Sequence, residues 1–448
     1  MKNRVVSQVR LLVQSASLLV FVYCFFALAY PVGREASWLI WLSRLDPWLL
    51  VGQGRLAATW PEWWWLPFGV AVVTLLLGRV FCGWLCPLGA LLTWTDTLSR
   101  RLLPERLLRR QQTLQKFLPL RYYWLLFLVL SFFLGANWVL FLTPYALLSH
   151  ELMLLGEKSI PWVLGIILVA TVLFARLWCS VLCPTGVLFS LLSKGKQLRY
   201  QVSGACSHCG ACARACSVGA SPEKTGNAGD GCMACGECQK VCPLQSIQWG
   251  GAAKNSSAET GKQMQTGSQS SRRRFFTTTA VVAVAILCWK QTATAMKRVL
   301  RPPGALAEPD FSAACNRCGR CIQVCPGKAL APMPVEEGLG SFATPFLTPR
   351  KARCDLCLAC QEVCPTGAIA AVPLEKVQMG QAVIDKPRCL AWSENKLCFI
   401  CGEQCPVLAI VDDGGHRPKV LAEKCVGCGS CENACPVDGE AAIRVTPR

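Results

Sequence analysis

The sequence predicts an α-helical membrane bundle with four spans, followed by small α+β domains, in a chain of 448 residues. Four long apolar stretches fill the first part of the chain, and the whole chain is 52% hydrophobic and only 16% charged. Beyond residue 200, 24 of the 30 cysteines fall into six groups of four. Such groups indicate small domains organised by metal rather than by a large apolar core.

The apolar stretches each approach the ~20 residues that cross the ~30 Å hydrocarbon layer as a helix. Tryptophan and tyrosine gather at their ends, as expected at membrane interfaces. The stretches are residues 11–30, 63–81, 122–142 and 161–178.

The loop at residues 100–121 is strongly basic, whereas those at 31–60 and 143–160 are much less so. We therefore expect an inner-membrane, multi-pass protein whose N-terminus and 79–121 loop are cytoplasmic, as are the residues after Trp178 up to the segment at 271–297.

The six cysteine groups each supply four thiols. Five share the spacing C-x2-C-x2-C-x3-C, which is the ligand run of a [4Fe–4S] cluster. The remaining group, the fifth along the chain, is a version stretched at its first gap. The groups are Cys206, Cys209, Cys212 and Cys216; Cys232, Cys235, Cys238 and Cys242; Cys315, Cys318, Cys321 and Cys325; Cys354, Cys357, Cys360 and Cys364; Cys389, Cys398, Cys401 and Cys405; and Cys425, Cys428, Cys431 and Cys435.

The stretched group is the one that begins at Cys389. In two-cluster ferredoxin domains the fourth cysteine of each run ligates the neighbouring cluster. We therefore expect two-cluster ferredoxin-like domains with exchanged ligands, so that Cys242 joins the 206–212 loop and Cys216 joins the 232–238 loop. The same exchange is expected between the two cysteine runs within residues 315–364 and between the two runs within residues 389–435.

A second motif, C-x3-C-P, occurs at Cys82/Cys86 and at Cys179/Cys183, where predicted spans meet the cytoplasm. Residues i and i+4 share one face of a helix, so each pair presents two thiols side by side. Together they supply the four thiols of a seventh metal site. A redox-active or an inert thiol pair is the alternative interpretation.

Between the second and third cysteine groups, residues 248–270 are mostly Gly, Ser, Ala, Gln, Lys and Thr, which predicts a flexible linker. Three arginines at 272–274 and a short apolar stretch follow, which indicates a twin-arginine signal as a fifth segment; an ordinary fifth span is the alternative. The predicted domains are 1–200 (membrane), 201–247 (cytoplasmic, two clusters), 248–270 (linker), 271–297 (signal or anchor) and 298–448 (periplasmic, four clusters).

Several other functions are excluded by composition. The net charge of +19 counts every cysteine as neutral, and six clusters would lower it by about 12, so nucleic acid is not an expected partner. The three histidines, His150, His208 and His416, do not provide haem ligands. His150-Glu151 is either a proton acceptor for quinol or part of a wet loop, His208 is expected to lie at a cluster surface, and Cys24 and Cys288 are interpreted as structural.

These motifs carry a resemblance to a known family. Residues 1–250 resemble NapH, a membrane ferredoxin-type subunit, through CGWLCPLGAL at 82–91, CSVLCPTGVLFSLLSKG at 179–195 and the runs at 206–242. Residues 271–448 resemble NapG of the MauM/NapG family, through the twin-arginine segment, RVLRPPGALAEPDFSAACNRCGRCIQVCP at 298–326 and CLAWSENKLCFICGEQCP at 389–406. The chain thus resembles a fusion of the two.

The resemblance implies electron transfer from membrane quinol through six [4Fe–4S] clusters to a periplasmic reductase, by default nitrate reductase, or its cytochrome. The sequence contains no recognisable motif for a molybdenum, flavin or nicotinamide site, so an electron-transfer subunit is expected rather than a self-sufficient enzyme. The alternative function is copper reduction or maturation of a respiratory enzyme. A route between cytoplasmic and periplasmic clusters is not evident from the sequence.

Overall fold

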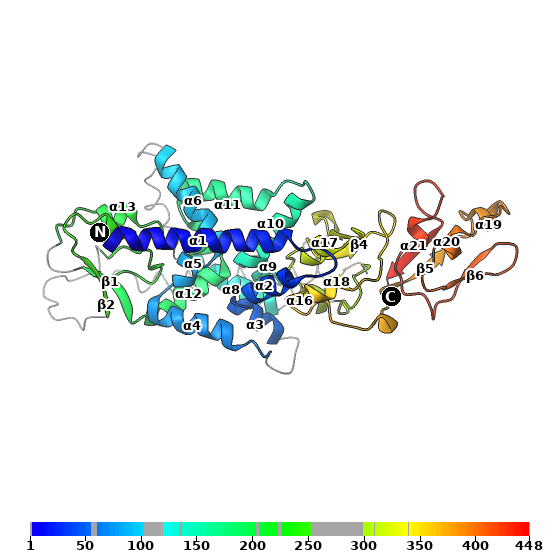
Figure 1. The fold of residues 1–448 in the computed structure, drawn as a ribbon, viewed down its shortest axis with the longest axis horizontal. Coiled ribbons are helices and arrows are strands. Elements are labelled where there is room, and N and C mark those ends of the chain that lie inside the picture. The colour runs from blue at the N-terminus through cyan, green and yellow to red at the C-terminus, as the bar shows by residue number, and fades with distance from the viewer. Residues whose placement is uncertain are drawn as a thin grey trace, which may run out of the picture.

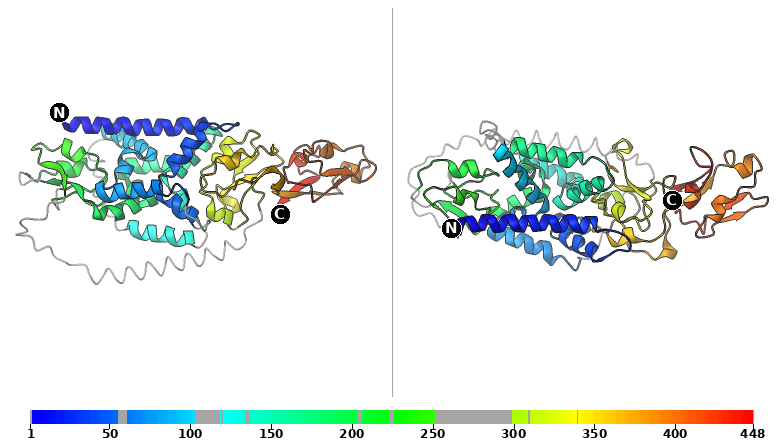
Figure 2. Two further views of the ribbon diagram at one scale, coloured as in Figure 1. Left: turned by 60° about the horizontal axis from the view of Figure 1, so that its bottom comes forward. Right: turned by 45° about the horizontal axis from the view of Figure 1, so that its top comes forward.

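The computed structural model describes residues 2–54, 61–102, 118, 120–133, 137–202, 206–222, 226–251, 299–308, 310–338 and 340–447. The described parts form a row (Figure 1): a small cysteine-rich domain, a helical body, and two further cysteine-rich units at the opposite end. The views of Figure 2 show the same order. The expected twin-arginine segment, Cys288 and most of the linker lie outside the described residues.

Helix α1 (Lys2–Phe26) runs along the helical body from one cysteine-rich end to the other (Figure 1). No glycine or proline interrupts its 25 residues, so the helix extends about 37 Å, enough to cross a membrane. Among the described residues, its segment Val6–Phe26 is the one helix long and apolar enough to do so.

The expectation of four full-length spans is therefore corrected. Helices α4 (Trp65–Leu77), α8 (Leu120–Phe133) and α11 (Trp162–Phe174) are apolar but contain 13, 14 and 13 residues. A 13-residue helix is only about 20 Å long. Helix α4 ends because Gly78 takes a positive φ of 85°, and α11 ends because Ala175 takes a positive φ of 55°.

The expected outer loops at 31–60 and 143–160 are also largely helical. The first contains α2 (Arg34–Ser43) and α3 (Pro47–Gly54), and the second contains α10 (Pro144–Gly156), whose residues from Pro144 to Met153 are all buried. The remaining helices of the body are α5 (Val80–Trp84), α6 (Pro87–Leu102), α9 (Trp138–Phe141), the π-helical turn η1 (Trp178–Leu182), α12 (Pro184–Leu192) and the 3-10 turn η2 (Ser193–Gly195).

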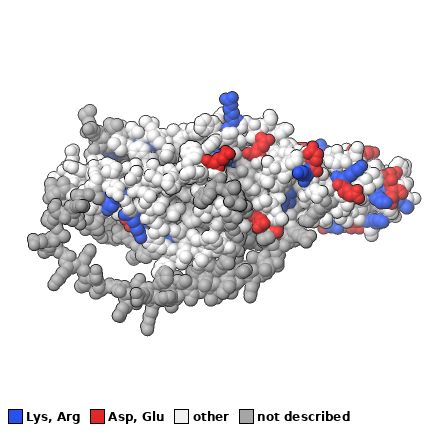
Figure 3. Space-filling model, turned by 90° about the horizontal axis from the view of Figure 1, so that it is seen from below, with Lys and Arg blue, Asp and Glu red and all other residues white. Residues whose placement is uncertain are grey.

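The helical body is apolar outside as well as inside. Its core joins α1, α6, α10 and α12, while large apolar side chains on α1, α4 and α11 are exposed, among them Leu19, Phe68 and Ile166. Figure 3 shows few charged side chains over the described part of this body, whereas acidic and basic side chains crowd the C-terminal end. An exposed apolar surface of this extent marks an interaction with lipid or with another protein.

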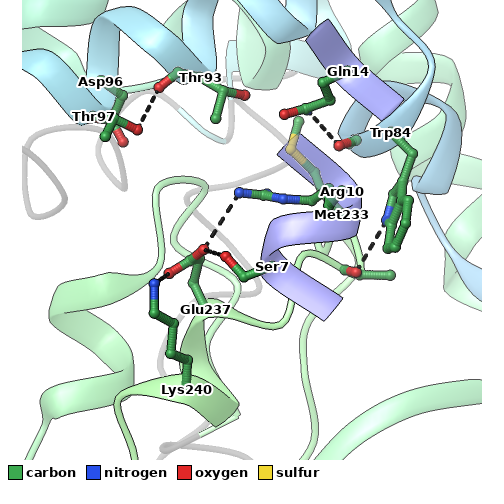
Figure 4. A network of polar contacts seen from close by, with 12 residues as sticks. Ser7, Arg10, Gln14, Trp84, Thr93, Asp96, Thr97, Met233, Glu237 and Lys240 are labelled. Atoms are coloured by element: carbon green, nitrogen blue, oxygen red, sulfur yellow. Dashed lines mark hydrogen bonds and ion pairs between the residues drawn. The ribbon is translucent and has the colours of Figure 1, made fainter. Parts of the chain in front are cut away.

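The first cysteine-rich domain is closed by antiparallel strands β1 (Leu198–Val202) and β2 (Ile247–Gly251), with α13 (Ala211–Ala215) and α14 (Glu237–Lys240) between them. The beginning of α1 holds this domain against the body (Figure 4). Ser7 Oγ donates to Glu237 Oε1 at 2.9 Å, and Arg10 Nη2 approaches the same oxygen at 3.4 Å. The carboxylate of Glu237 thus ties the domain to the N-terminal helix.

The C-terminal part consists of two units with short antiparallel strand pairs, β3–β4 in the first and β5–β8 and β6–β7 in the second. The strands are β3 (Leu330–Pro332), β4 (Pro345–Leu347), β5 (Gly380–Ile384), β6 (Ile410–Asp412), β7 (Pro418–Val420) and β8 (Ile443–Pro447). The helices are α16 (Asp310–Ala314), α17 (Arg320–Val324), α18 (Ala359–Glu362), α19 (Leu390–Ser393), α20 (Ile400–Glu403) and α21 (Ser430–Asn433), with 3-10 turns η3 (Val335–Glu337) and η4 (Leu374–Lys376).

Candidate metal centres

Each cysteine run folds as a loop that ends in one helical turn. The residue before the turn takes a positive φ at Gly210, Gly236, Gly319, Leu358 and Gly429. This reversal bends the chain so that the first three cysteines of a run surround one point. Leu358 takes a positive φ although it has a side chain. The loop therefore requires this backbone conformation at that position, which glycine merely adopts more easily.

Five cavities are each lined by three cysteines of one run and one cysteine of the paired run. They have similar empty volumes of about 360, 360, 370, 300 and 330 Å³. Their thiols are Cys206, Cys209, Cys212 and Cys242; Cys325, Cys354, Cys357 and Cys360; Cys389, Cys398, Cys401 and Cys435; Cys405, Cys425, Cys428 and Cys431; and Cys315, Cys318, Cys321 and Cys364.

The sixth set is formed in the same way. Cys216 lies close enough to Cys232 and Cys235 for their charges to interact, and Cys238 interacts with all three. All 24 cysteines are therefore grouped with their fourth thiol exchanged, which is the arrangement that the paired spacing predicts. The eight-residue gap after Cys389 is taken up by α19, and Cys389 still lines the same cavity as Cys398.

The surroundings of these thiols fit a cluster that requires thiolates. Backbone N–H groups donate to the sulfurs of several fourth ligands, for example Ala220 to Cys216 at 3.2 Å and Ala409 to Cys405 at 3.2 Å. Burial raises the pKa of Cys216 and of Cys315 to about 12, so without a positive centre these thiols stay protonated at neutral pH. Binding of iron supplies that positive centre and releases the protons.

Within the described residues, no three His, Cys, Asp or Glu side chains are placed to hold a single metal ion. This holds for the cysteine sets around the five cavities as well. The four thiols of each of these sets line one cavity, which is the arrangement that a polynuclear cluster requires.

The C-terminal sites follow one another in a row. Charges of Cys321 and Cys360 interact across the first pair of sites, and those of Cys431 and Cys401 interact across the last pair. Between the two pairs, Cys354 N donates to the carbonyl of Cys428 at 2.9 Å. Neighbouring sites therefore lie close together along this row.

The first C-terminal site is docked against the helical body. Arg320 donates to Ser43 Oγ at 2.8 Å and to the carbonyl of Leu39 at 3.3 Å. Asn137 Nδ2 donates to the carbonyl of Cys315 at 3.2 Å, and the Arg317 guanidinium lies 4.5 Å from the centre of the Trp138 ring. Arg317 and Arg320 are both buried, and they lie in the same loop as the ligand candidate Cys318. The loop that forms the site therefore also forms the docking surface.

The C-x3-C-P thiols come together inside the helical body. Cys82, Cys86, Cys179 and Cys183 are all buried, and each interacts electrostatically with the other three. Cys86 and Cys183 sit directly before the N-termini of α6 and α12, where the amides of Gly89 and Gly186 donate to their sulfurs at 3.3 and 3.4 Å. The sequence predicted four thiols in two pairs, and the structure brings the pairs together.

The structure also shows that these motifs belong to a longer internal repeat. Residues 78–89 and 175–186 share an arginine three positions before the first cysteine and a glycine three positions after the second. Arg79 and Arg176 are both buried, and a Cβ at Gly89 would lie 2.6 Å from the carbonyl oxygen of Cys82. Sequence reasoning missed Arg79 and Arg176, although this repeat was the signal that could have revealed them.

His150 and Glu151 lie in α10, not in a wet loop. They are 2% and 0% exposed, their side chains are 3.2 Å apart, and Glu151 Oε2 accepts from the backbone N–H of Leu164 at 3.0 Å. His208 is exposed, and it is its backbone N–H that approaches Cys206 Sγ, at 3.4 Å. Cys24 is buried in the core of the body.

Comparison with known families gives the same class of protein. Families described as 4Fe-4S binding domain match residues 59–104 with 159–200, residues 203–219 with 229–254, and residues 418–439, and a 4Fe-4S dicluster domain matches residues 314–368. The chain is an iron–sulfur ferredoxin-type electron-transfer protein that carries multiple [4Fe–4S] clusters. No solved structure matches it.

Curated relatives define the family more closely. The methylamine utilization ferredoxin-type protein MauM of Methylorubrum extorquens is 39% identical over 185 residues, which are 38% of this chain and 82% of that protein. Ferredoxin-type protein NapG of Escherichia coli is 36% identical over 185 residues, 38% of this chain and 79% of NapG. Over this part, the chain belongs to the MauM/NapG family of ferredoxin-type proteins.

Another relative is described by its name as an electron transport protein. The putative electron transport protein YccM of Escherichia coli is 31% identical over 192 residues, which are 39% of this chain and 52% of YccM.

Proposed function

We propose that the chain holds six [4Fe–4S] clusters and passes electrons from membrane quinol to a periplasmic reductase, nitrate reductase being the first candidate, or to its cytochrome. The observation that carries this proposal is the placement of the two cysteine-rich ends on opposite sides of an apolar helical body (Figure 1). We further propose that a NapH-type membrane part is here fused to a NapG-type part.

The apolar exterior of the body supports insertion in the membrane. Large apolar side chains are exposed along α1, α4 and α11, including Trp65 at 56% and Val169 at 60%. Although α4 and α11 are short, each is followed within a few residues by a second helical piece, α5 or η1, that continues the chain through the body. Broken helices of this kind are tolerated at membrane depth where the break is buried in protein.

In this arrangement the 206–242 sites lie in the cytoplasm and the 315–435 sites in the periplasm. Oxidation of one quinol releases two electrons and two protons. When bound, each cluster takes up or releases one electron at a time. The chain's own residues hold the clusters in a row, so that an electron moves between neighbouring sites and not through solvent.

The protons need an acceptor near the membrane surface. His150 and Glu151 form a buried pair in α10, the helix against which α17 of the first C-terminal site packs. We propose this pair as the proton acceptor, because it is buried in the helix that contacts that docked site. Its test is Glu151→Gln, which should lower quinol oxidation at least tenfold while iron content stays unchanged.

The proposed function is tested on the full chain, purified without oxygen. Six clusters require about 24 iron atoms per chain, and a water-soluble quinol analogue should reduce part of them, as seen by a paramagnetic signal. A chain with iron near zero, or with iron that only a strong chemical reductant can reduce, would refute the proposal. Oxidised analogue added under the same conditions is the control.

A further inference from the structure

We propose that Cys82, Cys86, Cys179 and Cys183 hold a further iron–sulfur cluster, with Arg79 as its counter-charge, and that this cluster connects the two ends of the chain. The inference rests on the proposed electron-transfer function and deepens it. It supplies the route that the six other sites leave open between the cytoplasmic and periplasmic parts.

The four thiols form a complete donor set. Each repeat contributes two cysteines, and every pair among the four lies within electrostatic range. Two of the sulfurs sit at helix N-termini and accept backbone N–H groups, an arrangement that stabilises thiolates.

A buried positive charge faces this donor set. Arg79 is 0% exposed and donates to the carbonyl of Cys179 at 2.5 Å. Its guanidinium also contacts Cys82, yet its Nε and Nη1 have no hydrogen-bond partner in the part of the chain that the structure describes. A buried guanidinium is costly unless an anion compensates it, and four thiolates around iron provide that anion.

The position of the four thiols fits a relay. On one side, Arg79 N donates to the carbonyl of Cys232 at 3.2 Å, and a Cβ at Gly83 would lie 2.5 Å from the carbonyl oxygen of Met233. The motif helix α5 therefore packs directly against the loop of a cytoplasmic site. Trp84 Nε1 adds a hydrogen bond to the carbonyl of Ala234 at 3.3 Å (Figure 4).

On the other side, two side chains lead to the first periplasmic site. Buried Tyr145 interacts electrostatically with Cys86 and Cys82 and with Arg320. Arg320 in turn interacts with Cys318 and Cys364 of the docked C-terminal site. The central thiols thus lie between the Cys232 loop, which α5 contacts, and the docked C-terminal site, whose helix α17 packs on the helix α10 that carries Tyr145.

The electron balance is simple. One electron reduces the central cluster as the neighbouring site is oxidised, and the electron then moves on to the next site, with no bond formed or broken. The donor remains the quinol named above. An electron entering at either end of the body can therefore reach both cluster sets.

Iron content tests whether the central cluster exists. The wild-type chain should contain about 28 iron atoms, and Cys86→Ser with Cys183→Ser should contain about 24, with one spin fewer in the fully reduced state. Cys24→Ser, which removes a buried thiol of the same body, should keep about 28. Arg79→Leu should lose the same four irons, whereas Arg79→Lys should retain them.

Transfer across a bilayer tests the connection. In vesicles that contain the full chain and trapped ferricyanide, dithionite added outside should bleach the ferricyanide, and the double variant should slow this bleaching at least tenfold. Equal rates in both proteins would overturn the relay.

The outcomes are separable from failure of the proposed function. About 24 irons in the wild type, unchanged in the double variant, overturns the central cluster and leaves the six-cluster protein standing. Copper at one atom per chain that depends on Cys86 and Cys183 also overturns it. The iron content of the wild-type chain alone distinguishes six clusters from seven. The central cluster is therefore tested even if the double variant does not fold.

Discussion

The docking of the C-terminal part on the helical body depends on Arg320, and its replacement provides a quantitative test. Arg320→Met keeps the apolar stem of the side chain and removes the guanidinium that donates to Ser43 and Leu39. A hydrogen bond from a charged group contributes about 1.5–3 kcal/mol. The carbonyl of Leu39 keeps its bond from Ser43 Oγ at 2.6 Å, so we take the lower value for each of the two bonds.

The loss is then about 3 kcal/mol, which corresponds to a change of roughly 150-fold in the docking equilibrium. Hydrogen exchange measured on peptides covering residues 34–43 and 144–156 should show protection falling by about two orders of magnitude, while the iron content stays near the wild-type value. Lys419→Met is the matched control, because its ion pair with Asp413 is exposed and contributes little. Protection within threefold of wild type in Arg320→Met would refute this account of the docking.

Three further results are expected. Glu237→Gln weakens the contact with Ser7 and Arg10 and should cost about 1 kcal/mol in thermal unfolding, with faster exchange confined to the first turns of α1; unchanged exchange there would contradict it. Gly319→Ala should destabilise the chain by about 1–2 kcal/mol, because the residue has a φ of +73° and its new Cβ would meet Met153; a variant with wild-type stability would show that the loop relaxes freely. Cys398→Ser should lose about four irons from the last site, and retention of all iron would mean that Cys398 is not a ligand.

The cysteine sites were the most predictable part of the molecule. The spacing of a run dictates a loop that surrounds one point, and two adjacent runs place each fourth thiol beside its neighbour's loop. That logic depends only on local sequence, so it extends to the stretched run at Cys389. The signal at 272–274 lies outside the described residues, and its interpretation stays a prediction.

The helical body was less predictable because its breaks depend on backbone conformation. The stretch at 63–81 contains one charged residue, Arg79, and its hydropathy does not show that the backbone takes a positive φ at Gly78 and ends α4 there. Conversely, residues 144–156 are apolar around the polar pair His150-Glu151, and they are buried between the body helices α1, α6 and α11 and the docked helix α17. Such contacts join residues that are far apart in the chain, so a local sequence pattern does not predict them.

The single-file order of the cysteine sites has a consequence for oxidative damage. Among the described cysteines, Cys209 is the exposed one, and it belongs to the site at the extreme tip of the molecule. Accessible thiolates are the first to be converted to sulfenic or sulfinic acids. Oxidative damage should therefore begin at the outermost site of the row. Its loss removes one site and leaves electron transfer between the remaining sites intact.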